Sequence, residues 1–214
     1  MGRRRKEPES VHRENIAAAA EALIAQKGIQ GTTMDEIANK SGYSKATLYV
    51  YFQDKEEIVG FLVHKSMKLL QECLTSAVFE PGTTKEKYDR ICCGLVRYQE
   101  HYPLYYTLVL SEINVNFEAG AYLSVEKEIF EVGEKINQTL SAFIRQETGI
   151  GKNQSELQTI QTVFWFWATL SGLIQLAAAK QVYMAKYLNI TKQQFLEDGF
   201  NKLYQIISSE DAGL

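Results

Sequence analysis

The sequence predicts an all-α protein of about nine helices. Apolar residues recur at helical spacing through most of the 214 residues, and no stretch alternates apolar and polar residues as a strand would. Pairs in which Thr or Ser is followed three residues later by Glu or Gln mark several helix starts. No internal repeat or low-complexity tract interrupts this pattern, and the clearest break is the turn-forming stretch 80–84.

The first helix is predicted over 10–27. Its apolar residues share one face at helical spacing and are Ile16, Ala19, Ala20, Leu23 and Ile24. Gly28 follows directly, at the position where a helix commonly ends on a residue with positive φ. This helix is therefore expected to pack across the two short helices that follow it in the chain.

Residues 32–57 contain three helix starts in close succession. Thr33 with Glu36 fits a capping box, and Ser44 is a natural N-cap for the helix after it. Asp54 with Glu57 repeats the box pattern at the third start, with Asp in place of Ser or Thr. Gly42 lies between the first two starts, where the chain leaves one helix and turns at once into another. Two short helices with a tight turn form a helix-turn-helix, so the recognition helix is predicted over 45–51.

This stretch resembles the DNA-binding region of TetR-type transcriptional repressors, over about the first quarter of the chain. The residues that carry the resemblance are Thr33, Ile37, Ala38, Gly42, Ser44, Thr47, Leu48, Tyr49, Tyr51, Phe52, Lys55 and Glu56. The sequence departs from the family at Ala46, where Gly is frequent, and at Tyr43, where a small aliphatic residue is common. The resemblance implies a three-helix DNA-binding head over 1–55 and, over 56–214, a helical bundle for ligand binding and dimerisation.

The DNA-binding residues are expected at the start of the recognition helix and around its rim. Those predicted to contact bases or phosphates are Thr33, Tyr43, Ser44, Lys45, Ala46, Thr47, Tyr49, Tyr51 and Lys55. The basic residues 3–6 are expected to form an arm that contacts phosphate or the adjacent minor groove when DNA is bound. In the free protein the same residues are expected to be a solvated tail. For any single tyrosine, a purely structural role is the alternative.

The remaining helices follow the same periodicity. They are predicted over 55–77, 85–101, 103–114, 121–147, 155–187 and 191–208. The helix over 155–187 carries Phe164, Trp165, Phe166 and Trp167 in succession, so aromatic side chains point in all directions around it. One face is expected in the core of the subunit and the other against a second subunit, as the family's four-helix dimer interface implies. A large monomeric bundle is the alternative.

The resemblance implies a ligand-responsive dimeric repressor that binds a palindromic operator and is released by a hydrophobic or aromatic small molecule. The bundle residues predicted to contact that ligand are Tyr102, Tyr105, Tyr106, Trp167 and Gln175. The alternative for each is a place in the ordinary core. The same residues also fit a DNA-binding regulator without a small-molecule inducer, which acts as an activator or is controlled by a protein partner.

An enzyme is disfavoured because no set of acid, base, nucleophile or metal ligands converges in the sequence. His12, His64 and His101 are isolated, and no metal-binding or Gly-rich phosphate motif is present. Three cysteines without C-x-x-C spacing argue against a zinc site or a disulfide scaffold. Of the adjacent Cys92 and Cys93, one is expected in the core and one near the surface. We expect no catalytic residues, metal or cofactor.

Charge and hydropathy favour a soluble cytoplasmic protein. The net charge is −3, but residues 1–55 carry nine Lys and Arg against seven Asp and Glu, which places the positive excess on the predicted DNA-binding head. No apolar run follows the basic start, so no signal peptide is expected. The most apolar stretch, 163–179, is interrupted by polar residues and is predicted to be a buried helix rather than a membrane span.

Overall fold

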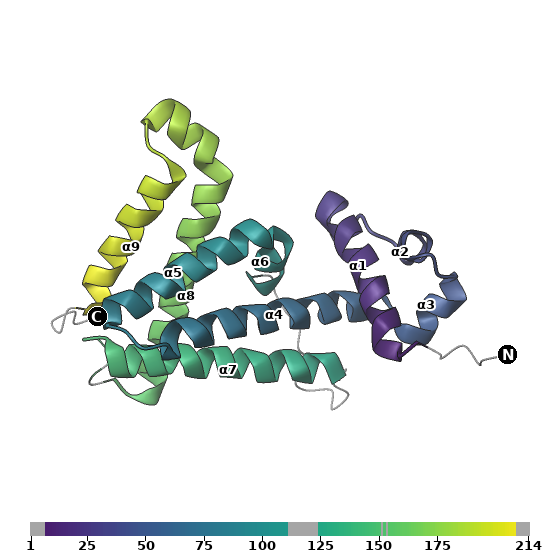
Figure 1. Ribbon diagram of the computed structural model, residues 1–214, viewed down its shortest axis with the longest axis horizontal. Helices are drawn as coiled ribbons and strands as arrows, with labels where there is room; N and C mark the ends of the chain where they lie inside the picture. Colours follow the sequence, from purple (N-terminus) through teal and green to yellow (C-terminus); the bar gives the residue numbers. More distant parts are fainter. Residues whose placement is uncertain (1–6, 111–123, 151, 153, 209–214) are drawn as a thin grey trace. The chain divides into compact units, whose positions relative to one another are not determined.

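The computed structural model describes residues 7–110, 124–150, 152 and 154–208, which form nine α-helices and one π-helical turn and contain no strand. The helices are α1 (Glu9–Lys27), α2 (Met34–Ser41), α3 (Lys45–Tyr51), α4 (Lys55–Phe79), α5 (Thr84–His101), α6 (Pro103–Leu110), α7 (Ser124–Glu147), α8 (Glu156–Tyr183) and α9 (Lys192–Ser208), with the π turn at Met184–Leu188 (Figure 1). The all-α prediction is confirmed. The predicted ends at residues 114 and 121 lie outside the described residues.

The chain forms two compact units, which are described separately. The first takes in Met1–Lys68 and Leu104–Glu131, and the second takes in Leu69–Pro103 and Val132–Leu214. Helix α6 and the start of α7 therefore cluster with the N-terminal helices. Long α4 begins in one unit and ends in the other.

The core of the first unit is made by the apolar faces of α1, α2 and α3, which lie against one another (Figure 1). Ile16, Ala20, Ile37 and Leu48 have no exposed side-chain surface or nearly none. Ala38 is also buried and is small, which lets α2 and α3 approach closely. Burial of each large aliphatic side chain contributes about 1.5–3 kcal/mol, so this cluster holds the three short helices together.

A partly buried hydrogen bond links helix α6 to α1 within this unit. The Tyr105 hydroxyl donates to Glu21 Oε2 on α1 at 2.8 Å. The start of α7 approaches α4 closely at Gly60, where an added Cβ would lie 3.1 Å from Val125 Cγ1. His64 Nδ1 also lies 3.3 Å from Glu128 Oε2, and burial lowers the pKa of His64 although this carboxylate opposes the shift.

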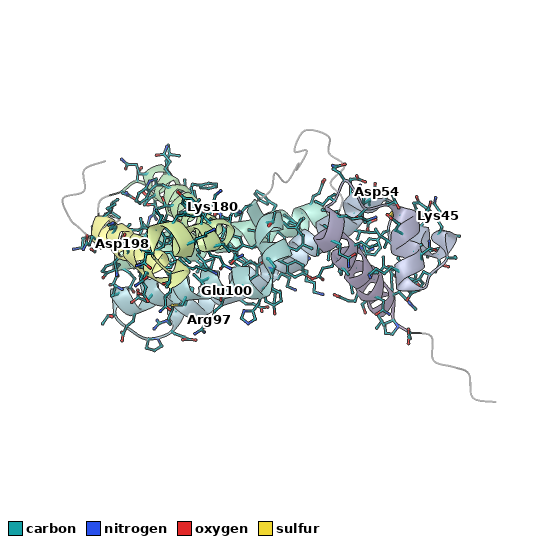
Figure 2. All side chains as sticks on the ribbon, turned by 90° about the horizontal axis from the view of Figure 1, so that it is seen from above. Lys45, Asp54, Arg97, Glu100, Lys180 and Asp198 are labelled. Carbon is teal, nitrogen blue, oxygen red and sulfur yellow. The ribbon has the colours of Figure 1, made fainter. Side chains whose placement is uncertain are left out.

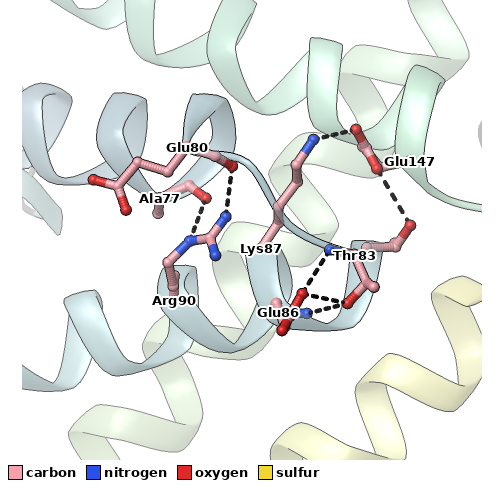
Figure 3. A network of polar contacts seen from close by, with 8 residues as sticks. Ala77, Glu80, Thr83, Glu86, Lys87, Arg90 and Glu147 are labelled. Atoms are coloured by element: carbon pink, nitrogen blue, oxygen red, sulfur yellow. Dashed lines mark hydrogen bonds and ion pairs between the residues drawn. The ribbon is translucent and has the colours of Figure 1, made fainter.

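In the second unit, the turn between α4 and α5 is held by a polar network (Figure 3). Thr83 and Glu86 form a complete capping box at the start of α5. Arg90 donates to the carbonyl oxygens of Ala77 at 3.1 Å and Glu80 at 2.8 Å, which lie at the end of α4 and just beyond it. Because terminal helix carbonyls lack intrahelical partners, a guanidinium is well suited to this place. Lys87 pairs with Glu147 of α7.

Helices α5, α8 and α9 pack around Tyr88. Its hydroxyl donates to the Phe200 carbonyl oxygen at 2.7 Å, and its ring centroid lies 6.0 Å from that of Phe166 and 5.1 Å from that of Tyr204. Burial raises the pKa of Tyr88 far above its ordinary range, so the phenol stays neutral and donates this hydrogen bond. Tyr88 thereby ties α5 to both C-terminal helices.

Helices α8 and α9 run side by side in opposite directions (Figure 1). One face of α8 is buried and includes Val163, Phe166, Leu170 and Ile174. The opposite face is exposed along its length, with Phe164 62% exposed and Val182 74% exposed. Within one chain, therefore, the aromatic run of α8 is only half covered.

Among the described residues, one helix is long and apolar enough, by length and composition alone, to cross a membrane. The stretch Glu156–Leu188 contains an 18-residue window of mean hydropathy 1.4, of which 39% is buried within the chain. Core helices of soluble proteins can be equally long and apolar. Helix α8 resembles them in having one buried face.

Candidate nucleic-acid interface

Helix α2 begins with the predicted capping box. The Thr33 hydroxyl oxygen accepts from the Glu36 N–H at 3.4 Å, and Glu36 Oε2 accepts from the Thr33 N–H at 3.0 Å. Lys27 at the end of α1 donates to the other carboxylate oxygen of Glu36. The hydrogen bonds from Lys27 and then Thr33 lower the pKa of Glu36 to about 2. The carboxylate therefore joins the end of α1 to the start of α2.

The turn between α2 and α3 depends on Gly42. Its φ of 76° and ψ of 14° lie in the left-handed region, which an L side chain adopts only at a cost. The Tyr43 N–H then donates to the Ala38 carbonyl oxygen at 3.1 Å, which closes the end of α2. The chain is thus redirected within two residues into the N-cap of α3.

Helix α3 begins at the predicted N-cap. Ser44 Oγ accepts from the Thr47 N–H at 3.0 Å and lies 2.7 Å from Thr47 Oγ1. Only Leu48 of this helix is buried, and it anchors α3 to the core. The outward residues Lys45, Ala46, Tyr49 and Val50 are exposed, and Lys45 is labelled on the outer side of α3 in Figure 2. A short helix held by one buried side chain leaves most of its surface open to a groove.

The end of α3 is held by Arg13 of α1. Its Nη1 donates to the Tyr51 carbonyl oxygen at 2.7 Å, and its Nη2 donates to Glu57 Oε1 at 2.9 Å. The guanidinium carbon also lies 4.2 Å from the ring centroid of Phe52. Tyr51 is the last residue of α3, so its carbonyl has no partner within the helix and Arg13 supplies one.

An imidazole and two phenol rings lie together beside the recognition helix. His12 Nδ1 on α1 is 2.7 Å from the Tyr43 hydroxyl oxygen. The His12 ring centroid lies 5.0 Å from that of Tyr51, and the two tyrosine rings meet edge to face at 6.3 Å. All three side chains are half-buried, so each keeps one side toward solvent.

The predicted cationic contacts are both engaged within the free chain. Lys45 Nζ lies 2.7 Å from Asp35 Oδ1 of α2, and this hydrogen bond raises the pKa of Lys45. Lys55 Nζ donates to the Ile29 carbonyl oxygen at 3.0 Å, in the segment after α1. Both pairs are reachable by water, so a DNA phosphate would compete with these partners rather than meet a vacant cation.

At the start of α4 the structure differs in one detail from the capping pattern in the sequence. Asp54 Oδ1 accepts from the Glu57 N–H at 2.7 Å, as that pattern requires. The Glu57 carboxylate reaches back to the Gln53 N–H at 2.7 Å instead of that of Asp54, because its other oxygen is held by Arg13.

The nine predicted DNA-contacting residues all lie on the helix-turn-helix and its two neighbouring helix ends, and their contacts with DNA stay predictions. Thr33 and Ser44 serve as helix caps, and Thr47 bonds to Ser44. Sequence reasoning missed Val50, which is 75% exposed on α3. An apolar residue turned outward between two tyrosines is suited to a thymine methyl group.

The family model for bacterial regulatory proteins of the tetR family matches residues 16–60, which cover most of α1, all of α2 and α3, and the start of α4. The helix-turn-helix segment of the chain therefore matches the tetR family. These residues hold the two short helices and the turn that the sequence predicted as a DNA-binding motif. One relative, the fatty acid metabolism regulator protein of Bacillus subtilis, is 25% identical over 135 residues. The aligned region covers 63% of each chain, so it spans less than two thirds of that relative.

Solved structures of other proteins share the fold over almost the whole chain. FadR from Bacillus subtilis, solved in complex with stearoyl-CoA, has a TM-score of 0.63 at 19% identity and aligns over 92% of this chain and 98% of its own. AibR, solved with isovaleryl coenzyme A and operator DNA, has a TM-score of 0.64 at 18% identity and aligns over 90% of this chain and 98% of its own. At this identity the likeness shows the fold.

The residues predicted to contact an effector occupy different environments. Tyr105 and Tyr106 are buried, Trp167 is half-buried, and Tyr102 and Gln175 are exposed. Gln175 lies on the same open face of α8 as its neighbour Leu176. These five assignments stay predictions. Within the described residues, no group of three or more His, Cys, Asp and Glu side chains is arranged to hold a metal ion.

Hollows on the described surface of the second unit include one beside α7 and one near the end of α8. The larger, of about 930 Å³, lies between α7 and α8 and is lined mainly by polar side chains, with Arg145 as its cation. The smaller, of about 340 Å³, lies at the α8–α9 tip and is lined by Leu176, Tyr183 and Phe195 among others. Neither is lined by any of the five residues predicted to contact the effector.

Proposed function

We propose that the protein is a dimeric transcriptional repressor that binds a palindromic operator and is released by a small molecule. The supporting observation is the open face of α3, anchored by buried Leu48 and framed by the caps of α2 and α3. We assign DNA binding to residues 1–55, and effector binding and dimerisation to 56–214. The proposed repressor acts in the cytoplasm and has no enzymatic activity.

The exposed face of α8 supports dimerisation. Phe164, Leu176 and Val182 share this face with Ala168 and Gly172, whose small side chains would let a second helix approach closely. A continuous exposed apolar stripe is costly on a monomer and is typical of an interface. A two-fold axis through this face gives two recognition helices, which read half-sites about 34–36 Å apart.

The proposed effector is an apolar or aromatic small molecule. Two structural neighbours were solved with acyl thioesters of coenzyme A, stearoyl-CoA for FadR and isovaleryl coenzyme A for AibR. We therefore propose acyl-CoA as the first class to test on this chain. An effector that prefers the conformation in which the two heads do not match the half-sites lowers DNA affinity by simple linkage.

The DNA-binding part of the proposal is tested with a fluorescent duplex from the region upstream of the protein's own gene. Binding is titrated against salt and against random-sequence competitor DNA. We expect one dimer per site and binding that survives competitor, and then release by acyl-CoA of one chain length but not by free coenzyme A. If random-site selection also yields no preferred sequence, the proposal is wrong. If specific binding ignores every acyl-CoA, a regulator without this class of inducer is the better description.

The dimer is tested by sedimentation of the purified chain at micromolar concentration. Leu176→Glu places a charge on the exposed face of α8, so we expect it to shift the protein from dimer to monomer. Gln26→Glu adds the same charge to an exposed position of α1 and should leave the dimer intact. A wild-type protein that sediments only as the 24.3 kDa chain contradicts dimerisation.

A further inference from the structure

The first residue of the recognition helix is paired with a carboxylate from the helix before it. Lys45 Nζ lies 2.7 Å from Asp35 Oδ1, so this ion pair bridges the N-terminal turns of α3 and α2. Asp35 belongs to the first turn of α2, where the helix dipole favours a carboxylate. The neighbouring Glu36 is engaged elsewhere, with Lys27 and Thr33. Asp35 is therefore the acidic partner of Lys45.

The Asp35–Lys45 pair carries no net charge, yet its ammonium keeps hydrogen-bond donors for a further partner. A lysine ammonium has three N–H donors, and a single carboxylate oxygen takes one of them. The side chains of Lys45 and Asp35 are 56% and 63% exposed, so the remaining donors are open to an approaching molecule. An unpaired lysine attracts any phosphate, whereas this pair presents donors without an excess of positive charge.

Such a pair distinguishes the two kinds of acceptor that DNA offers. A phosphate oxygen carries negative charge, so the Asp35 carboxylate repels it while Lys45 attracts it, and the two effects largely cancel. Guanine O6 and N7 in the major groove are uncharged acceptors, and arginine and lysine are their usual protein partners. The remaining donors of Lys45 therefore keep their attraction for a guanine edge and lose most of it for a phosphate.

We propose that Asp35 is a specificity-determining residue, which holds Lys45 as a reader of guanine in the major groove rather than as a contact to the DNA backbone. The inference deepens the proposed function and rests on the recognition helix entering an operator. Lys45 alone is a flexible point charge that binds phosphate whatever the sequence. Asp35 orients the ammonium and cancels its charge, so Lys45 adds to operator preference more than to total affinity. Each half-site is then expected to hold a G·C base pair at Lys45.

The test compares wild type with Asp35→Asn and with the double variant Asp35→Asn/Lys45→Met, which has the net charge of wild type but no ammonium. The dissociation constant of the full chain is measured over a range of salt concentrations, for a duplex carrying the site found by random-site selection and for a random duplex. We expect the plot of log affinity against log salt concentration to be equally steep for wild type and the double variant. In Asp35→Asn the unpaired Lys45 reaches a phosphate, so the slope becomes steeper by about 0.9 for each recognition helix.

Operator preference separates the same proteins in a second way. Replacing the selected G·C pair should weaken wild-type binding about tenfold, and the double variant should show no such preference. Asp35→Asn should bind the random duplex more tightly than wild type, which lowers its ratio of specific to random affinity. Asp198→Asn is the matched control, because Asp198 pairs with Lys202 at 2.6 Å on α9 and is 64% exposed. It should keep the wild-type slope and ratio.

Two results overturn this inference and leave the repressor proposal intact. If Asp35→Asn has the wild-type slope while the double variant is less steep, Lys45 leaves Asp35 to bind phosphate. If the double variant selects the same operator as wild type, Lys45 reads no base. Failure of wild type to select any operator overturns the repressor proposal as well. Thermal unfolding checks each variant, and Asp35→Ala with Asp35→Ala/Lys45→Met repeats the comparison if Asp35→Asn is unfolded.

Discussion

Arg13 offers a direct test of how α1 holds the end of the recognition helix. Its guanidinium spans two acceptors, the Tyr51 carbonyl oxygen at 2.7 Å and Glu57 Oε1 at 2.9 Å, and it also lies over the Phe52 ring. Arg13→Lys keeps the charge but has no planar fork, so it can serve only one acceptor at a time. Arg13→Ala removes both bonds and leaves Glu57 without its cation.

The size of the loss follows from burial. The side chains of Arg13 and Glu57 are 24% and 15% exposed, so solvent weakens their ion pair only in part. A hydrogen bond to a charged group contributes about 1.5–3 kcal/mol, and a cation over an aromatic face adds about 0.5–1 kcal/mol. After discounting for exposure, we expect Arg13→Lys to cost about 1–2 kcal/mol and Arg13→Ala about 3 kcal/mol of unfolding free energy for the first unit.

The assay must report on the correct unit. Both tryptophans, Trp165 and Trp167, lie on α8 in the second unit, so their fluorescence follows the wrong part of the chain. Hydrogen exchange of the Phe52 amide, which donates to the Leu48 carbonyl oxygen at 3.0 Å, reports on the end of α3 directly. We expect faster exchange in Arg13→Lys and faster still in Arg13→Ala.

A double-mutant cycle with Glu57→Gln isolates the ion pair from the carbonyl contact. We expect a coupling of about 1 kcal/mol between positions 13 and 57, with the remaining loss independent of Glu57. Unchanged exchange at Phe52 in Arg13→Ala would refute this account, because that variant has no side-chain donor for the Tyr51 carbonyl oxygen.

Three further predictions concern single contacts. Thr33→Ala should lower the free energy of unfolding by about 1 kcal/mol, because it removes the α2 cap. The pKa of Glu36 is lowered from 4.5 to about 2, so the free energy of unfolding of wild type, measured by urea titration, should fall as pH falls from 4.5 toward 2. The fall should be smaller in Thr33→Ala, which lacks the Thr33 side-chain hydrogen bond to Glu36. Tyr105→Phe should cost about 0.5–1.5 kcal/mol and speed amide exchange in α6, since the bond to α1 disappears; unchanged exchange would contradict this. Burial raises the pKa of Cys92 to about 12, so iodoacetamide should modify exposed Cys93 first in the folded protein, and equal rates would count against it.

The helix-turn-helix could be predicted from the sequence because its determinants are local. The Thr33 and Ser44 caps each act within three residues, and Gly42 adopts positive φ from its own lack of a side chain. The predicted recognition helix, 45–51, has the same bounds in the structure. The expectation for the cysteine pair is also confirmed, with Cys92 buried and Cys93 exposed, because adjacent helical residues point about 100° apart.

The sequence by itself determined the all-α class, the helix starts and the resemblance of residues 33–56 to the tetR family, since capping, turn chemistry and periodicity depend on residues a few positions apart. Only the tertiary structure decided which polar groups meet across long separations. The bonds from His12 to Tyr43, from Arg13 to Tyr51 and from Lys55 to Ile29 each join residues 26 to 38 positions apart. No periodicity encodes such a pairing, because it arises when the apolar faces of separate helices pack and bring their polar edges together.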